Sequence, residues 1–226
     1  MLFMCFMVIF CVALNGSQEI MIAIVDYGMG NLRSVQKALL RAGADARIVT
    51  SPLALASAEK IVLPGVGAFA DAIAKLRATG LDRAVVEAVG QGVPLLGICL
   101  GFQLLFDVSY EDGLHTGLGL LPGKVVRFEF PTSRVGEPLK IPHMGWNQLT
   151  TKPGCPLFRG IENGSHVYFV HSYHAVPINQ DVIAATTDYG YDFPAAIWSN
   201  NVFATQFHPE KSQAVGRQML ENFVNL

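Results

Sequence analysis

The sequence predicts an α/β fold: a doubly wound, mostly parallel sheet with an added antiparallel β layer. In the first hundred residues, short apolar segments alternate with amphipathic ones, which is typical of parallel strands joined by helices. After residue 120 the segments become short strands punctuated by Gly and Pro, which indicates antiparallel strands. No repeat or low-complexity linker interrupts the chain, so we expect one domain over residues 21–226.

Four strands and two helical segments are predicted in the first half. Residues 21–26 form a nearly continuous apolar run, as expected of a strand covered on both faces. Further strands are predicted at residues 47–50, 60–63 and 93–98. Residues 68–89 indicate a helix that breaks near Gly80, and an earlier helix is indicated by apolar residues at helical spacing, namely Leu32, Val35, Leu39 and Leu40.

The second half is predicted to supply the antiparallel layer. Its final segment, residues 212–223, has the pattern of a closing helix. The strands that precede it are predicted at residues 124–128, 146–150, 166–176, 182–187 and 195–207.

Composition excludes several classes of function. Hydrophobic residues make up 51% of the chain and charged residues only 15%, against roughly 25% in an average soluble domain. The formal net charge is -2 and basic residues are scattered, so no groove for nucleic acid is indicated. The six histidines lack the spacing of a metal-binding helix, and we expect neither a metal nor another cofactor.

The four cysteines favour a reactive thiol over a disulfide framework. Cys5 and Cys11 lie in the apolar N-terminal stretch, Cys99 and Cys155 lie in the domain, and no pair forms a C-x-x-C motif. This pattern suits a reducing compartment, so we expect a cytoplasmic protein.

Residues 1–20 are set apart from the domain. The first fourteen are almost purely apolar, in a run too short to span a bilayer. The run resembles the core of a secretory signal, but it lacks a positively charged start. The alternative is translation from an upstream start codon with Met21 as the working start. We expect no membrane insertion in either case.

A Gly-Ile-Cys-Leu-Gly segment centred on Cys99 is the strongest indication of a catalytic residue. A nucleophile at a sharp strand-to-helix turn needs small residues two positions to either side, because the backbone is crowded there. The following helix would present N–H groups and a partial positive charge, which favour thiolate over thiol. We expect Cys99 to be a nucleophile, with a buried structural cysteine as the alternative.

A thiol nucleophile needs a base that is held in place. His208-Pro209-Glu210 ends the last predicted strand. Residues two apart in an extended strand point the same way, so His208 and Glu210 can address one site. We expect His208 to act as general base toward Cys99, and Glu210 to orient and polarise its imidazole.

Glycines that follow the strand at residues 60–63 suggest an oxyanion site. Acyl chemistry needs N–H donors aimed at the developing oxyanion, one after the nucleophile and one from a neighbouring loop. Glycine lets a backbone amide approach a ligand closely. The candidates are the N–H of Leu100 and an amide at Gly65 or Val66.

Together these residues resemble the class I glutamine amidotransferases, with the Cys, His, Glu order of that family. Within it, the chain from Met21 onward is similar to the glutaminase subunits of imidazole glycerol phosphate synthases of histidine biosynthesis. The stretches that carry this likeness are residues 26–32, 64–67, 142–147 and 168–173. The N-terminal extension is foreign to the pattern, and Phe102 stands where a methionine is more usual.

The resemblance implies an activity and a substrate site. Cys99, His208 and Glu210 would hydrolyse glutamine to glutamate and ammonia through a cysteine thioester. On the residues alone, His171 and His174 lie in an aromatic stretch where strand packing is the expectation. By resemblance, glutamine would be held by Gln103, Glu111 and the backbone around Gly67, His171 and Ser172.

The resemblance also implies a heterodimer with a (β/α)8-barrel cyclase. That partner would use the ammonia to make imidazole glycerol phosphate and an aminoimidazole carboxamide ribotide. Exposed aromatic residues suit an interface, although core packing is the alternative. The implied docking face contains Asn31, Met144, Trp146, Tyr168 and Lys211.

Other functions stay open at this point. One is the glutaminase of another synthase, such as an anthranilate or pyridoxal phosphate system, which residues 142–147 speak against. Another is a non-catalytic binding subunit, which the intact set of Cys99, His208 and Glu210 speaks against. A third is a cysteine hydrolase of γ-glutamyl peptides, which should work without a partner.

Overall fold

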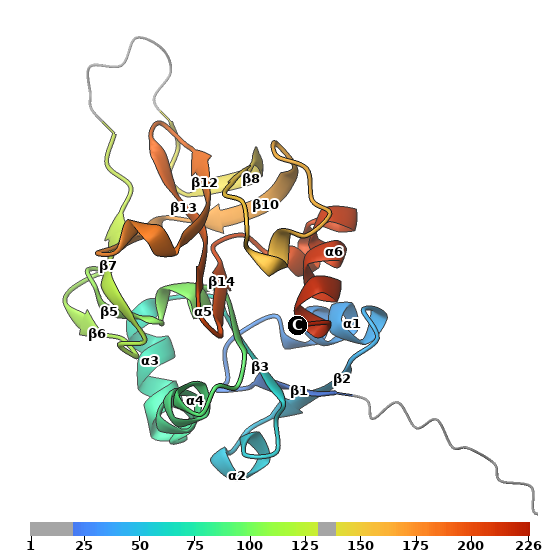
Figure 1. The fold of residues 1–226 in the computed structure, drawn as a ribbon. Helices are drawn as coiled ribbons and strands as arrows, with labels where there is room; N and C mark the ends of the chain where they lie inside the picture. Colours follow the sequence, from blue (N-terminus) through green and yellow to red (C-terminus); the bar gives the residue numbers. More distant parts are fainter. Residues whose placement is uncertain (1–19, 131–138) are drawn as a thin grey trace, which may run out of the picture.

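An eight-stranded mixed sheet forms the centre of the molecule (Figure 1). The computed structural model describes residues 20–130 and 139–226, so the expectation for residues 1–20 lies outside the described residues except at Ile20. The strand order is β2-β1-β3-β4-β14-β13-β12-β9. The chain moves outward from β1 to β2 and returns to β3 on the other side of β1, which confirms the predicted doubly wound arrangement.

Five neighbouring strands of this sheet run parallel. Ile22 and Ile24 face one core, whereas Ala23 and Val25 face the other. Both faces are thus buried, which explains the continuous apolar run of the first strand. The parallel strands are β2 (Asp45–Val49), β1 (Met21–Val25), β3 (Lys60–Gly65), β4 (Leu95–Cys99) and β14 (Val202–Thr205).

Antiparallel strands extend the same sheet beyond β14. They are β13 (Asp192–Ser199), β12 (Ile183–Asp188) and β9 (Thr150–Thr151). The single strand predicted over residues 195–207 is wrong, because the chain turns at Asn200 and β13 pairs with β14 as a hairpin. Asn200 has a φ of 52°, a left-handed conformation that Asn tolerates in turns.

Two smaller sheets complete the added β layer. The first pairs β8 (His143–Gln148) with β10 (His166–His171). The single strand predicted over residues 166–176 is also wrong, since it divides at Ser172 and its second half joins another sheet. That second sheet contains β11 (Tyr173–Pro177), β7 (Leu121–Arg127), β5 (Phe106–Ser109) and β6 (His115–Thr116).

Helices cover both faces of the main sheet (Figure 1). Packed on one core are α1 (Leu32–Arg41) and α6 (Gln213–Val224), and on the other α3 (Phe69–Ala78) and α4 (Leu81–Gly90). Gly80, with a φ of 71°, makes the predicted break between α3 and α4. In the part of the chain that the structure describes, no helix is both long and apolar enough to cross a membrane. The short elements are α2 (Pro52–Leu55), α5 (Leu100–Gln103) and the 3-10 turns η1 (Pro156–Phe158), η2 (Gln180–Val182) and η3 (Pro209–Lys211).

Helix α5 lies against β3 in very close contact at Gly101. A Cβ atom at this position would lie 1.8 Å from the carbonyl oxygen of Leu63 and 2.8 Å from its carbonyl carbon. Gly97 in β4 is also crowded, since a Cβ there would lie 3.0 Å from the Gly101 oxygen. The glycines on either side of Cys99 are therefore required by the packing of this helix on the sheet.

We expect Gly101→Ala to lower the free energy of unfolding by about 3 kcal/mol or more, because the added methyl group forces α5 away from β3. Urea unfolding followed by circular dichroism measures this change. Gly90→Ala is the matched control: it lies at the end of α4 in open space, and alanine favours a helix by up to about 1 kcal/mol. Equal losses in the two variants would contradict the packing argument.

Candidate active site

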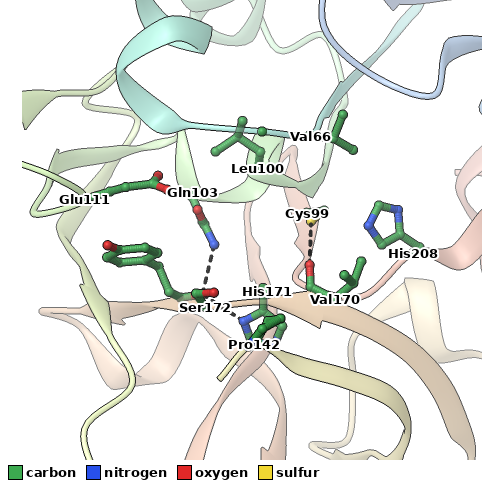
Figure 2. A pocket seen from close by; sticks show the side chains of 12 residues that line it. Val66, Cys99, Leu100, Gln103, Glu111, Pro142, Val170, His171, Ser172 and His208 are labelled. Carbon is green, nitrogen blue, oxygen red and sulfur yellow. Dashed lines mark hydrogen bonds between the residues drawn. The ribbon is translucent and has the colours of Figure 1, made fainter. Parts of the chain in front are cut away.

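A pocket of about 410 Å³ lies where β3 and β4 end and where β10 passes into β11. The carboxyl ends of parallel strands are the usual position of a ligand site in this type of sheet. Figure 2 shows Cys99 and His208 toward one end of the pocket, and Gln103 and Glu111 toward the other. The lining residues are Val66, Gly67, Cys99, Leu100, Gln103, Glu111, Pro142, Val170, His171, Ser172, Tyr173 and His208.

Cys99 occupies the sharp turn between β4 and α5. Its φ of 55° and ψ of -109° are unusual for a residue with a side chain, and such a conformation costs on the order of 1–3 kcal/mol. The turn brings the sulfur to the pocket wall, 4.0 Å from the carbonyl oxygen of Val170 and 4.0 Å from Nε2 of Gln206. This is the predicted strand-to-helix turn with its side chain presented to the pocket.

His208 and Glu210 form a buried pair. Nδ1 of His208 lies 2.8 Å from Oε1 of Glu210, and their side chains are only 2% and 1% exposed. The extended geometry predicted for this segment is wrong, because β14 ends at Thr205 and Pro209 begins the turn η3. The turn folds the carboxylate of Glu210 back onto the imidazole. The predicted contact between the two side chains therefore forms, but through a turn instead of an extended strand.

Main-chain contacts fix the position of His208. Its backbone N–H donates to the carbonyl oxygen of Tyr168 at 3.0 Å. The hydroxyl of Ser212 donates to the carbonyl oxygen of His208 at 2.7 Å and accepts from the N–H of Tyr168 at 3.0 Å. Strand β10 and the start of α6 thus hold the backbone of His208, and Glu210 holds its ring.

The surroundings of His208 favour the protonated form of its imidazole. Burial lowers its pKa, but interactions with Cys99 and with the carboxylate of Glu210 outweigh burial and raise the pKa to about 9. Its Nε2 atom makes no hydrogen bond to any described residue. A buried ring nitrogen without a partner, beside a sulfur at the pocket wall, is placed to exchange a proton with a bound molecule.

The glycine segment at residues 64–67, at the end of β3, lies beside the nucleophile. β3 runs two residues further than predicted, and Gly65 pairs with Cys99 across the sheet. The hydroxyl of Tyr27 donates to the carbonyl oxygen of Pro64 at 3.0 Å, which fixes the peptide between Pro64 and Gly65. Val66, Gly67 and Leu100 line the pocket, whereas Gly65 is not among its lining residues.

Gln103 and Glu111 bring polar atoms to the far end of the pocket. Nε2 of Gln103 donates both of its hydrogens, to the carbonyl oxygen of Tyr173 and to Oε1 of Gln206, each at 3.0 Å. Its Oε1 atom stays available as an acceptor. Oε2 of Glu111 accepts from the N–H of Phe69 at 2.8 Å, and burial raises the pKa of Glu111.

His171 combines two expected roles. It lines the pocket beside Ser172, and its ring also packs within an aromatic cluster that includes Phe128, Phe169 and Phe193. Burial lowers the pKa of His171 to about 3. Its Nδ1 lies 2.8 Å from the carbonyl oxygen of Tyr173, so in the neutral ring this nitrogen carries the hydrogen.

A second histidine continues this contact toward the surface. Nε2 of His171 must accept, and its partner at 3.1 Å is Nδ1 of His143. Burial lowers the pKa of His143 to about 4, so this ring is also neutral. Nε2 of His143 then accepts from the side-chain amide of Asn147 at 3.2 Å. The direction of each hydrogen bond is therefore fixed: Asn147 donates to His143, His143 donates to His171, and His171 donates to the carbonyl oxygen of Tyr173 at the pocket wall.

Four residues of the site were missed by sequence reasoning. Pro142, Val170 and Tyr173 line the pocket, and the amide of Gln206 contacts the sulfur of Cys99. Pro142, Val170 and Tyr173 belong to the stretches that carried the family resemblance, and Gln206 lies two residues before His208. Their proximity to these motifs was the available signal. Among the residues that the structure describes, no cluster of three His, Cys, Asp or Glu side chains is arranged to hold a metal ion.

Most of the predicted docking residues lie on the outer face of the small β8–β10 sheet. Met144 and Trp146 are 62% and 46% exposed, and Trp146 is paired across the strands with Tyr168. The rings of Trp146 and Tyr168 meet edge to face, with 6.0 Å between their centres. Nζ of Lys211 lies 5.6 Å from the centre of the Tyr168 ring. Asn31 is exposed at the start of α1.

We expect Glu210→Gln to lower the pKa of His208 from about 9, because the carboxylate that favours the imidazolium is removed while burial still favours the neutral ring. Titration of the histidine C–H resonances by NMR measures the shift. Glu221→Gln, at an exposed pair with Arg217 on α6, is the control and should leave the titration unchanged. An unchanged pKa in Glu210→Gln would show that Glu210 does not govern this imidazole.

Solved structures share this fold. A putative GMP synthase protein from Thermoplasma acidophilum has a TM-score of 0.68 and 21% identity, covering 92% of this chain and 93% of that one. PurLQS from Thermotoga maritima has a TM-score of 0.69 and 20% identity, covering 92% of this chain and 98% of the matched chain. Both likenesses concern the fold alone.

Sequence relatives are much closer. The imidazole glycerol phosphate synthase subunit HisH of Syntrophotalea carbinolica is 55% identical over 203 residues, covering 90% of this chain and 98% of the relative. The protein of the same name from Geobacter sulfurreducens is 54% identical over 202 residues, covering 89% of this chain and 97% of the relative. The family model for class I glutamine amidotransferases matches residues 23–226. With the strained cysteine turn and the buried His–Glu pair in place, the chain belongs to the class I glutamine amidotransferase family.

Proposed function

We propose that this chain is the glutaminase subunit of an imidazole glycerol phosphate synthase. It hydrolyses glutamine to glutamate and ammonia and delivers the ammonia to a (β/α)8-barrel cyclase in histidine biosynthesis. The observation that carries the proposal is that Cys99 and His208 line one end of the pocket, with Glu210 buried and paired to His208. Relatives named as synthase subunits, 50–55% identical over most of the chain, support the choice of synthase.

The first half of the reaction forms a thioester. His208 takes the proton of the Cys99 thiol on Nε2, and the sulfur attacks the side-chain amide carbon of glutamine. A carbon–sulfur bond forms while the carbonyl electrons move to oxygen. The carbon–nitrogen bond then breaks, the nitrogen takes the proton from His208, and ammonia leaves. Glu210 stabilises the imidazolium throughout, which the raised pKa of His208 supports.

The second half of the reaction releases glutamate. A water molecule gives a proton to Nε2 of His208 and adds to the thioester carbon. The carbon–sulfur bond breaks, and the proton returns from His208 to the sulfur of Cys99. Each addition places negative charge on the substrate oxygen, for which the N–H groups of Leu100 and of Gly65 or Val66 are the proposed donors.

Acceptor groups at the far end of the pocket suit the amino group of glutamine. The unused Oε1 of Gln103 and the carboxylate of Glu111 would receive its ammonium hydrogens. The backbone at Gly67, His171 and Ser172 would hold the rest of the amino-acid part. This arrangement leaves the side-chain amide directed toward Cys99.

The partner would bind on the outer face of the β8–β10 sheet and at Asn31. Exposed Met and Trp side chains, a cross-strand aromatic pair and a cation over its ring are typical of interface anchors. The described free thiols, Cys99 and Cys155, fit a reducing compartment, so we place the complex in the cytoplasm.

We expect residues 21–226 to release glutamate from glutamine slowly alone and much faster with a cognate cyclase and its nucleotide ligand. Coupled glutamate detection measures the rates. Cys99→Ala should abolish the stimulated rate, because no thioester can form. High activity without a partner would favour a free hydrolase. Stimulation only by another synthase would assign the chain to that synthase, and inactivity under all conditions would favour a non-catalytic binding subunit.

The interface can be tested in the same assay. Trp146→Ala should raise the cyclase concentration needed for half-maximal stimulation at least tenfold, because truncating an aromatic anchor that the partner would bury costs about 2 kcal/mol or more. Trp198→Ala is the matched control, since Trp198 is also partly exposed but stacks on Phe203 in the β13–β14 hairpin. Equal effects of the two substitutions would place the partner elsewhere.

A further inference from the structure

The buried side chain of Gln206 contacts the site but has no part in the reaction described above. It follows β14 directly, its backbone N–H donates to the carbonyl oxygen of Ala195 at 2.8 Å, and none of the residue is exposed. A buried amide is costly unless its oxygen and nitrogen both find partners. The two partners of this amide are therefore informative about its role.

Hydrogen bonding determines which end of the amide faces which neighbour. The carbonyl oxygen of Tyr173 can only accept, so the atom of Gln103 that lies 3.0 Å from it is the donor Nε2. The same Nε2 lies 3.0 Å from the side chain of Gln206, which must present its acceptor Oε1 there. Nε2 of Gln206 is consequently turned toward Cys99, 4.0 Å from the sulfur.

Besides His208, the sulfur of Cys99 therefore has two polar neighbours of opposite character. The carbonyl oxygen of Val170, at 4.0 Å, can accept from a thiol but repels a thiolate. The N–H of Gln206 can donate to either form and binds the anion more strongly. When the proton moves to His208, the Gln206 contact gains strength and the Val170 contact loses it.

We propose that Gln206 is a catalytic residue that donates a hydrogen bond to the Cys99 thiolate through Nε2 and holds Gln103 in its substrate-binding position through Oε1. No proton leaves the amide, so its contribution is stabilisation of the anion alone. Only the second role rests on the proposed glutaminase function. The first requires neither glutamine nor a partner.

Alkylation of Cys99 by iodoacetamide across a pH series tests the first role, because only the thiolate reacts. Peptide mapping by mass spectrometry distinguishes Cys99 from the other cysteines. We expect Gln206→Met to raise the pH midpoint of Cys99 alkylation by about one unit. At pH values below the midpoints of both the unsubstituted protein and the variant, alkylation of the variant is then about tenfold slower. Gln206→Glu keeps an acceptor for Gln103 but places oxygen beside the sulfur, so its shift should be larger.

Thr187→Val is the matched control. Thr187 is buried, and its hydroxyl has no hydrogen-bond partner among the described residues, so the substitution should leave the Cys99 profile unchanged. An unchanged midpoint in folded Gln206 variants would overturn the proposal. Because the assay contains no glutamine and no partner, that result would leave the glutaminase assignment untouched.

If the Gln206 variants do not fold, an NMR measurement on the side-chain amide of Gln206 in the unsubstituted protein tests the proposal instead. The side-chain ¹H–¹⁵N resonances of Gln206 should shift with pH at the midpoint of Cys99 alkylation. In Cys99→Ala that titration step should disappear. A step that persists unchanged in Cys99→Ala would show that the amide does not respond to the sulfur and would overturn the proposal.

Discussion

The contact between Gly101 and the carbonyl oxygen of Leu63 is the constraint on which the site depends. It allows α5 to pack directly against β3, and the chain enters this helix through the positive φ of Cys99. The strain at Cys99 is offset by the burial of apolar residues that follow it, including Phe102 and Leu104. The nucleophile is thus held by the packing of a helix on a sheet, and not by its own side chain.

Around this turn, buried polar groups occur in pairs whose partners determine their state. His208 has a carboxylate beside it, and its pKa rises to about 9. His171 and His143 are also buried but face each other without a carboxylate, so their pKa values fall to about 3 and about 4. The same residue type can therefore hold a proton for chemistry at one position and act as a neutral structural link at another.

Sequence reasoning located the parts of the site that local geometry determines. Strand-to-turn patterns predict Cys99 with its flanking glycines, the His208–Glu210 pair and the glycines at the end of β3, and all of these lie at or beside the pocket. It failed where pairing between distant segments decides the outcome. Strand alternation continues through Ser172, so nothing local shows that β10 and β11 join different sheets. Gln206 was missed for the same reason, because its side-chain partners, Gln103 in α5 and Cys99 at the end of β4, lie more than a hundred residues earlier in the chain.

The most direct test of Cys99 as the nucleophile uses an electrophilic analogue of glutamine, such as its chloromethyl ketone, in the presence of a cognate cyclase. Cys155 is an internal reference, since it is about as buried as Cys99 but lies outside the pocket. We expect covalent label on Cys99 alone, with glutamine slowing its formation. Label on Cys155 at a similar rate, or labelling of Cys99 that glutamine does not slow, would contradict the account.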